Sequence, residues 1–570
     1  MLPPTELFSK IDDWLKRRTG LDAPLLAIIA IFFFGMLPVA SSRVIDSMNF
    51  ERYYTDAAVS MLQSHDYLTP IQGEGRLRLH KPLPIYWLLI GSYKLFGVSF
   101  FSTRICFLLI ACATIWLAAK LALKLTADVR CARVTALILL SNVLFLTVAA
   151  RATQDILVTF ALLISGYGFI RLICLNETRA SAYWSAYGGA ALGVATKGVL
   201  PGLFVIYALL FAAFTSSREK PFRRVLHPGV ILASTIIAAS PFLLLLWKHG
   251  PPVLQSFWAD QFGEKTGIRG SIFRIAEYLF IYVPFLLPWL LCLGWLFYKA
   301  KPETAISAPQ RQAFRFVLIW ALLLAIVFGL GDRVQDRYLA PALPLLAIVI
   351  AIQLCRFPSS SVAKVTDPLI NLATIAFFAI ALFGLTLLWQ NGLLTKHAAT
   401  LTIVLLAALL IALRLQRKQF SSAAVFSISL FLVLALCLAI LSPFTLPDQT
   451  GQIARALRVL NPEKKPIYVI GTNKLASRLR ISSGVAYEIH LAKRKDLLPP
   501  TSGSATNPIF ILSEGEARRV NANEFQIREV AAYPIQISLR ELVRKTLRGE
   551  SKSYIESKCK RCYAVVAKRS

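Results

Sequence analysis

The sequence predicts a polytopic α-helical membrane protein with a small C-terminal α/β extramembrane domain. Of its 570 residues, 56% are hydrophobic, and the mean hydropathy is +0.59. Soluble domains are typically about 45–50% apolar, so this chain has an excess. The excess lies in long runs, and a run of about 20 apolar residues is enough to cross a bilayer.

Residues 22–443 contain the apolar runs and are predicted to form a transmembrane domain of about thirteen helices. Residues 1–21 precede the first run and read as a cytoplasmic amphipathic segment without a signal-peptide cleavage site. The runs begin near residues 22, 101, 132, 155, 182, 200, 229, 272, 314, 338, 367, 397 and 422.

The distribution of Lys and Arg predicts the orientation of these helices. With the N-terminus inside, the cytoplasmic segments include KLTADVRCAR, SSREKPFRRVLH, KAKPETAISAPQRQAFR and RLQRKQ, all of them basic. Competing loops such as LWQNGLLTKH carry one Lys each, and Lys/Arg excess marks the cytoplasmic side. We therefore expect residues 41–100 and the segment from 444 onward to lie outside.

Residues 444–570 alternate strand-like stretches (PIYVIG, PIFILS, CYAVVA) with helix-like ones, as in a small α/β domain. They hold 23 Lys and Arg and 11 Asp and Glu. This excess of positive charge does not conflict with an external position, because long domains are translocated across the membrane largely regardless of their charge. Cys559 and Cys562 are closely spaced, but a zinc site would need a second pair of ligands. A local disulfide or two free thiols is the preferred interpretation.

The net charge of +31 must lie in the loops and the C-terminal domain. A basic surface of this kind faces anionic lipid headgroups or phosphorylated substrates. Nucleic acid is not expected as a partner, because most of the chain is too apolar to lie in water.

Charged residues from at least five segments meet at the predicted external face. Together, such acids and bases can bind a phosphate and polarise a hydroxyl group. Each one taken separately is also typical of an interfacial anchor. The set consists of Asp46, Glu51, Arg151, Asp155, Lys197, Asp260, Glu264, Lys265 and Arg269, followed by GDRVQDRYLAP.

The external segment 41–100 is too long for a simple connection and contains two predicted interfacial helices, FERYYTDAAVSMLQ and PIYWLLIGSYKLFG. Between them lies RLRLHKPLPIYW, which joins Arg76, Arg78, His80 and Lys81 to aromatic residues including Tyr86. Lys81 precedes the second helix, at an end that favours anions. The segment therefore predicts either a phosphate site or contacts with lipid headgroups.

The order of these motifs resembles a known family. After the first apolar run come E..YY...A..ML, KP.P.YW with LFG, TRICFLLIACATIWLAAKLAL, RATQDILVTF, TKG.LPG and DRYLAPALPLLA. This order, over residues 22 to about 355, resembles the bacterial membrane glycosyltransferases of the aminoarabinose transferase and protein O-mannosyltransferase superfamily. The resemblance implies a GT-C fold and a sugar donor linked to polyprenyl phosphate.

The resemblance also implies roles for individual residues. Of the family's acidic pair in the first external loop only Glu51 is kept, and Asp46 is a spatial substitute; the later acid falls on Asp155. These three are the candidate catalytic residues. The candidate residues for binding the phosphate or substrate are Lys81, Tyr338, Arg76, Arg78, Lys197, Arg337, Lys265, Arg269, Tyr86 and His80.

Three positions depart from the family pattern. Phe50 replaces the first acid, and His80 stands where the aminoarabinose branch has Glu. The loop pattern EH..RF reads DQFGEK, so the family's His becomes Gln261 and its Arg becomes Glu264. Lys265 or Arg269 could supply that positive charge. No cofactor or metal ligand set is predicted, and a divalent metal is left open.

The predicted function is transfer of a sugar from polyprenyl phosphate to a lipid A-like glycolipid or another envelope acceptor, with inversion, at the external face of a bacterial inner membrane. A protein O-mannosyltransferase-like activity is the alternative. A transporter or flippase for an anionic lipid is less favoured, because the charges gather at one membrane face and no internal repeat is evident. A scaffold with a polymer-binding basic tail is a third hypothesis.

Overall fold

The computed structural model describes residues 22–41, 51–72, 75–215, 221–262, 268–330, 334–394, 398–415, 421–445, 449–470, 473–492, 508–534 and 537–567. The predicted N-terminal segment 1–21, Asp46 and Lys265 lie outside these residues. Arg269 lies in a described helix, but its side chain is not among the described features.

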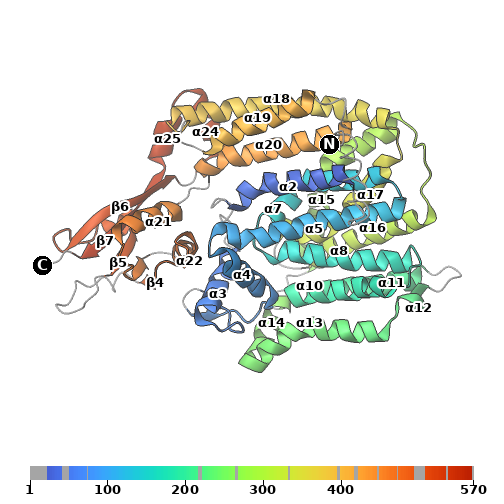
Figure 1. Cartoon of the computed structure of the whole chain (residues 1–570), viewed down its shortest axis with the longest axis horizontal. Helices are drawn as coiled ribbons and strands as arrows, with labels where there is room; N and C mark the ends of the chain where they lie inside the picture. The colour runs from blue at the N-terminus through green and yellow to red at the C-terminus, as the bar shows by residue number, and fades with distance from the viewer. Residues whose placement is uncertain are drawn as a thin grey trace, which may run out of the picture.

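A bundle of apolar helices forms most of the molecule and confirms the predicted fold class (Figure 1). In the described residues, eight helices are long and apolar enough to cross a membrane, or up to nine if one bent pair is a single span. The eight are α2 (Ala23–Ser41), α5 (Phe100–Thr126), α8 (Gln154–Ile173), α13 (Pro228–His249), α15 (Ile268–Lys299), α16 (Ala308–Gly329), η3 (Asp336–Ala342) continued by α17 (Leu343–Cys355), and α18 (Ser359–Gln390).

The remaining predicted apolar runs also form helices, although these are shorter or bent. The bent pair, α6 (Val129–Leu140) and α7 (Val143–Ala149), turns by 71°. Each of the thirteen predicted starts falls in or next to an apolar helix of the bundle. The shorter or interrupted ones are α9 (Ala180–Tyr183) with η2 (Trp184–Gly188) and α10 (Gly189–Lys197), then α11 (Leu200–Phe214) and α19 (Ala398–Leu415). Helix α20 (Ser422–Thr445) has 24 residues, and only its part Ser422–Cys437 is fully described.

Glycines allow the η2–α10 stretch to lie against α8. A Cβ atom on Gly168 would lie 2.1 Å from the backbone nitrogen of Ala186, and one on Gly189 would lie 2.5 Å from that of Ser165. A larger residue at either position would therefore push the two backbones apart. This close approach brings the end of α10, where Lys197 lies, to the beginning of α8.

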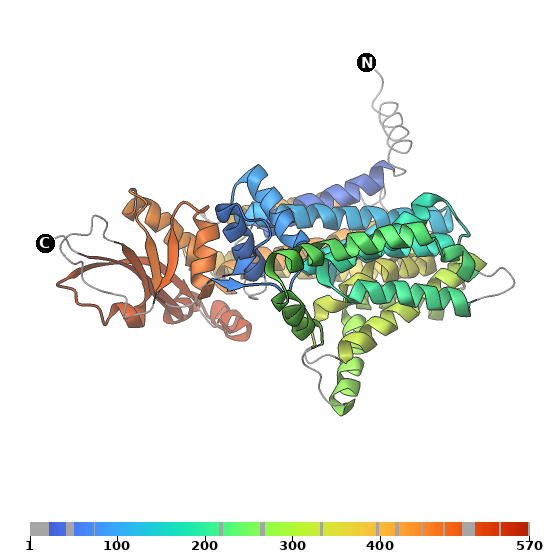
Figure 2. The ribbon, with the colours of Figure 1, turned by 90° about the horizontal axis from the view of Figure 1, so that it is seen from below.

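The segment between the first two spans folds into α3 (Glu51–Ser64), a hairpin of β1 (Ile71–Gln72) and β2 (Arg76–Leu77), and α4 (Pro84–Phe96). The predicted amphipathic helix is present, and α3 buries Tyr54, Ala57, Ala58 and Met61 of its apolar face. It also buries Thr55, Asp56 and Val59, so it is enclosed on more than that one face. The segment lies at the end of the bundle that faces the C-terminal sheet domain (Figures 1 and 2).

The C-terminal region forms a five-stranded mixed sheet in the order β4-β3-β5-β7-β6. β3 pairs in parallel with β4 and β5, whereas β7 is antiparallel to β5 and β6. β3, β5 and β7 are the strands that the sequence predicts. The strands are β3 (Ile467–Ile470), β4 (Ile489–Ala492), β5 (Ile509–Ser513), β6 (Phe525–Pro534) and β7 (Cys559–Ala567).

Short helices surround this sheet and connect it to the bundle. Gln390, at the end of α18, donates to the carbonyl of Thr546 (2.8 Å), and Arg480 of α22 donates to Asp56 of α3 (2.8 Å). The other helices outside the bundle core are α12 (Pro221–Val225), α14 (Pro252–Phe262), α21 (Gln449–Leu460), α22 (Asn473–Ser482), α23 (Glu514–Ala517), α24 (Leu539–Leu547) and α25 (Ser551–Ser557).

Cys559 and Cys562 both lie in β7 and are free thiols. Positions three apart in a strand point to opposite faces of the sheet, which prevents a local disulfide. Of the alternatives left open by the sequence, two free thiols is the one that the structure has.

Candidate functional site

Glu51 begins α3 and forms a buried ion pair with Arg104 of α5. Nε and Nη2 of Arg104 donate to the two carboxylate oxygens of Glu51 at 2.8 and 2.7 Å. The backbone N–H of Ala152 donates to Oε1 at 2.7 Å. Burial raises the pKa of Glu51, but Arg104 and this N–H outweigh it, so the pKa lies below its ordinary value. Glu51 is therefore a carboxylate with both oxygens engaged.

Asp155 lies at the first turn of α8 and faces two cations from other helices. Lys197, the last residue of α10, donates to its Oδ1 at 2.7 Å, and Nε of Arg337 lies 3.6 Å from Oδ2. Asp155 itself is buried. The ion pair joins the beginning of α8, the end of α10 and η3.

Tyr338, a candidate residue for binding the phosphate, lies beside this cluster. Lys197 Nζ lies 4.6 Å from the centroid of its ring, and the Arg337 guanidinium lies 5.6 Å from it. The ring stacks on Phe328 of α16 at 4.6 Å. Cations over an aromatic face are held by the ring's electron density. Tyr338 therefore helps to position two positive charges of the site.

Lys81, in the loop between β2 and α4, forms its ion pair with Asp260 of α14. The two carboxylate oxygens accept from Nζ at 2.8 and 2.7 Å. The side chains are 19% and 23% exposed, respectively. Burial, followed by the charges of Arg78 and Lys197, lowers the pKa of Lys81 against the opposing effect of Asp260. The ammonium group therefore lies where other positive charges are near.

Arg78 is buried and lies between the hairpin and α3. Its guanidinium is 4.9 Å from the ring of Tyr53 and 4.8 Å from that of Tyr54, and Nη1 donates to Gln72 (2.8 Å). Tyr86 of α4 packs against Tyr54 with ring centroids 6.1 Å apart. These aromatic rings exclude water from one side of the cation.

The electrostatic environment of Tyr54 shows that these groups act on one region. Burial raises its pKa to about 12; Asp155 raises it further, whereas Arg78 and Arg337 lower it. Its hydroxyl donates to Gln154 at 3.2 Å. Four cations, Arg78, Lys81, Lys197 and Arg337, thus gather around two carboxylates, Asp155 and Asp260. Such an excess of positive charge can bind a phosphate group.

The other predicted residues occupy different positions. His80 is neutral, because burial and the charges of Arg78 and Lys81 lower its pKa to about 4. Arg76 lies in β2 with an exposed side chain. The predictions for Asp46, Lys265 and the Arg269 side chain concern residues or atoms that the structure leaves undescribed.

Sequence reasoning missed Arg104 and the partner role of Asp260. Arg104 is fully buried near the beginning of a span, and an arginine inside an apolar run is a signal that could have identified it. Asp260 was recognised as a charge at a span end, but nothing in the sequence indicates that Lys81, 179 residues away, is its partner.

Comparisons with known proteins agree with this architecture. A family model described as dolichyl-phosphate-mannose-protein mannosyltransferase matches residues 80–247. An uncharacterised protein of Aquifex aeolicus is 27% identical over 53% of this chain and 58% of its own length. The undecaprenyl phosphate-alpha-4-amino-4-deoxy-L-arabinose arabinosyl transferase 1 of Proteus mirabilis is 25% identical over 52% of this chain and 53% of its own length. The chain thus spans just over half the length of the curated relatives it matches.

Solved structures resemble nearly the whole chain. ArnT from Cupriavidus metallidurans bound to undecaprenyl phosphate matches with a TM-score of 0.67 at 16% identity, covering 95% of this chain and 97% of that one. The apo state of the same protein matches with a TM-score of 0.64 at 17% identity, covering 89% and 95%.

The helical bundle, the external segment and the C-terminal sheet domain together define a multi-pass membrane protein of the GT-C class. More narrowly, residues 80–247 are similar to the mannosyltransferase family model, and about half of the chain is similar to aminoarabinose transferases.

Proposed function

We propose that this protein transfers a sugar from a polyprenyl-phosphate carrier to an envelope acceptor. One observation carries the proposal: Arg78, Lys81, Lys197 and Arg337 gather around Asp155 and Asp260 at the end of the bundle next to α3 and α4. A lipid phosphate leaving group needs such a cluster. The relatives whose names include undecaprenyl phosphate support the same donor class.

In the proposed reaction, an acceptor oxygen attacks the anomeric carbon and the bond to the phosphate oxygen breaks, with inversion. The electron pair of that bond stays on the carrier phosphate, and Lys81 with the nearby arginines stabilises the developing negative charge. One well-placed donor of this kind lowers a barrier by about 3 kcal/mol, roughly 100-fold in rate. The acceptor's proton, where it has one, goes to a carboxylate or to water.

Asp155 is the better-placed candidate to orient the acceptor, because its partners Lys197 and Arg337 belong to the cation cluster. Glu51 has both oxygens occupied by Arg104 and Ala152. We therefore assign to Glu51 the positioning of the α7–α8 turn beside Asp155. A phosphate acceptor, as on lipid A, needs no strong base, which is consistent with the absence of the family's first acid at Phe50.

The proposed location is a bacterial inner membrane, with the N-terminus in the cytoplasm. The site and residues 444–570 then lie on the periplasmic side, and residues 22–443 form the catalytic domain. The basic segments of the sequence support this orientation. A lipid A-like glycolipid is the acceptor we favour, and the match to the mannosyltransferase family model supports a protein acceptor as the second candidate.

The test uses full-length protein in detergent with labelled undecaprenyl-phosphate aminoarabinose or mannose and either lipid A or an acceptor protein. We expect release of undecaprenyl phosphate and a mass increase of one acceptor. Intact donor in every combination, with well-folded protein, would contradict the proposal and favour a transporter. Lys94→Ala is the matched control for variants of Lys81, because Lys94 lies in the same external segment over the Tyr67 ring.

A further inference from the structure

A second cluster of reactive side chains lies at the opposite end of the bundle from the cation cluster. Asp128 precedes α6, Cys131 lies in its first turn, and Cys355 ends α17. Their carboxylate and sulfur atoms all lie within 4.8 Å of one another. In the described part of the chain this is the one group of three or more such side chains placed to share a metal ion. Helix α5 runs from Phe100 to Thr126, with Arg104 near its beginning and its last residue two positions before Asp128, so the two sites are roughly 30 Å apart.

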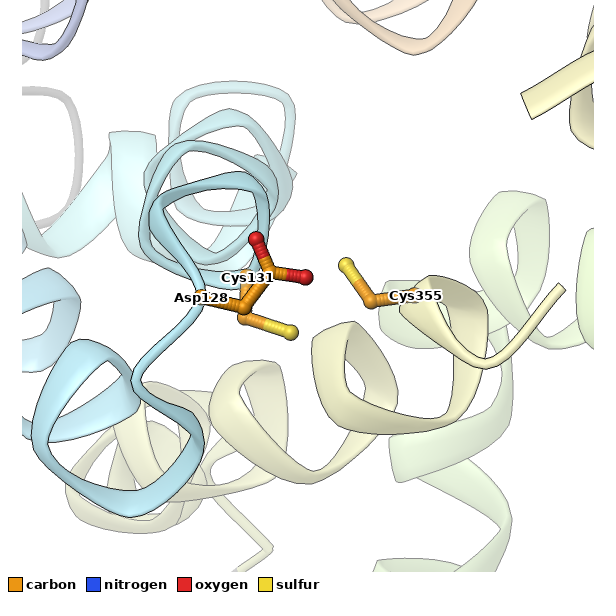
Figure 3. A group of neighbouring side chains, drawn as sticks. All are labelled: Asp128, Cys131 and Cys355. Carbon is orange, nitrogen blue, oxygen red and sulfur yellow. The ribbon is translucent and has the colours of Figure 1, made fainter. Parts of the chain in front are cut away.

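We propose that Asp128, Cys131 and Cys355 bind a thiophilic divalent cation of the zinc class. Figure 3 shows the two sulfur atoms and the carboxylate directed into one space between α6 and α17. Around a tetrahedral zinc ion, with Zn–S of about 2.3 Å and Zn–O of about 2.1 Å, ligand atoms are separated by roughly 3.5–3.8 Å. Small side-chain rotations bring the observed atoms to that spacing, and water fills the fourth position.

The surroundings fix the ligands and balance the charge. Asp128 accepts from the backbone N–H of Arg130 (2.8 Å) and from its Nε (3.2 Å), and Nη2 of Arg130 donates to the carbonyl of Cys355 (3.3 Å). Arg130 therefore connects the two chain segments that supply the ligands. Hydrogen bonds of this kind orient ligating carboxylates in metal sites.

Charge also favours the assignment. Zinc displaces one proton from each thiol, so two thiolates, one carboxylate and Zn²⁺ carry a net charge of −1. The guanidinium of Arg130 offsets that charge. Cys131 is only 3% exposed, so its sulfur is shielded from solvent. Asp128 is partly exposed, which leaves a path for the ion.

The bound ion would join the beginning of α6 to the end of α17. At this point the structure shows two polar contacts between the helices, the hydrogen bond from Arg130 to Cys355 and a long contact from Cys131 Sγ to the carbonyl of Ala351 at 4.0 Å. A metal bond is stronger than either contact, so loading the site should raise thermal stability.

The experiment measures zinc in the full-length protein, purified without a histidine tag and kept reduced with a non-chelating phosphine. After incubation with zinc and desalting, we expect one ion per wild-type chain by mass spectrometry. Cobalt should give a sulfur-to-metal charge-transfer band. Cys131→Ser and Cys355→Ser should lose the band and bind the ion at least roughly tenfold more weakly.

Two further variants keep the test independent of folding. Asp128→Asn keeps a good N-cap for α6 and removes only the ligand charge, so it should weaken binding without unfolding the helix. Cys174→Ser is the matched control: Cys174 is a buried free thiol at the same end of the bundle, where Glu177 pairs with Lys124, and it should bind zinc normally.

The outcomes are distinct. Equal zinc binding by wild type and by the Cys131→Ser/Cys355→Ser double variant would overturn the proposal. The proposal would also be overturned if the isolated protein contains a Cys131–Cys355 disulfide and takes up no zinc after that disulfide is reduced. Loss of the charge-transfer band in the two cysteine variants, with an unchanged band in Cys174→Ser, supports it.

Discussion

Two ion pairs at the end of the bundle next to α3 and α4 use similar chemical groups in opposite ways. Arg104 and Glu51 are 0% and 7% exposed, and each carboxylate oxygen accepts from one guanidinium nitrogen. Lys81 and Asp260 are 19% and 23% exposed, and a single ammonium group contacts both oxygens. The first pair is closed to other molecules, whereas the second is within reach of them.

The difference indicates which pair is structural and which is exchangeable. In a buried pair with fixed bidentate geometry, neither charge can exchange its partner for water unless the protein unfolds. The partly exposed pair lies among further cations, so a phosphate can replace Asp260 as the counter-ion of Lys81. We infer that Asp260 stands in for the substrate phosphate when the site is empty.

Breaking the closed pair should have the largest effect. Arg104→Ala leaves the Glu51 carboxylate buried without its partner, and we expect a loss of about 3–5 kcal/mol in the free energy of unfolding. Thermal unfolding in detergent measures it. The double variant Arg104→Met/Glu51→Gln should be less destabilised than Arg104→Ala, because it buries no unpaired charge. An unchanged melting temperature for Arg104→Ala would remove the distinction between the two pairs.

Removing the cation of the open pair should change activity and leave stability nearly unaltered. For Lys81→Ala we expect kcat/KM to fall about 100-fold, equivalent to about 3 kcal/mol of barrier. The Lys94→Ala control should keep wild-type turnover. Asp260→Asn should lower KM for the donor, because the phosphate no longer competes with a carboxylate. Wild-type turnover by Lys81→Ala would exclude the phosphate role.

A third pair, Arg480 with Asp56, connects the C-terminal domain to α3, the helix that begins with Glu51. Asp56 is 4% exposed, and Arg480 is 26% exposed. Arg480→Ala should cost about 1–3 kcal/mol, since it leaves a buried carboxylate with fewer partners. Arg518→Ala in the same domain breaks an exposed pair with Glu514 and should cost less than about 1 kcal/mol. Equal losses of unfolding free energy in Arg480→Ala and Arg518→Ala would mean that the pair between Arg480 and Asp56 contributes no more to stability than an exposed pair.

The sequence predicted the parts of this molecule that depend on local pattern. Apolar runs predicted the helices of the bundle, and periodicity predicted the helix α3, although this helix is buried on more than its apolar face. The family resemblance singled out Lys81 and Lys197, and their roles stay predictions. For the helices, the signal lies within a few neighbouring residues, where side-chain spacing directly reflects helix geometry.

Pairings between distant segments could not be predicted in the same way. Arg104 lies in an apolar run, and its partner Glu51 is 53 residues away. Cys131 lies in the basic segment KLTADVRCAR and Cys355 ends an apolar run more than 200 residues later, so nothing local joins the two cysteines. Such pairs depend on which helices become neighbours, and a single sequence does not record that choice.

The smallest expected effect concerns pH dependence, in which the two ion pairs also differ: Lys81 affects the activity at alkaline pH, and Glu51 affects the stability at acid pH. At both Glu51 and Lys81, burial is the largest effect and opposes the charged form. At Glu51 the attraction of Arg104 and the hydrogen bonds outweigh burial and lower the pKa, whereas at Lys81 burial outweighs the attraction of Asp260 and lowers the pKa of the amine. The folded pKa of Lys81 therefore lies below its ordinary value of 10.5. Because the protonated amine binds the phosphate, activity should be complete below that lowered pKa and fall as the pH rises through it.

Lys81→Arg tests this assignment, because a guanidinium stays charged throughout the accessible range. Its activity, even if lower overall, should lack the alkaline decline, and a pH series of donor turnover measures it. At the acid end, Glu51 has a folded pKa below its ordinary value of 4.5. Its contribution to stability is thus complete above about pH 4.5 and disappears as the pH falls through the folded pKa. An alkaline decline that persists in Lys81→Arg would assign the titration to another group and leave Lys81 as a purely structural partner of Asp260.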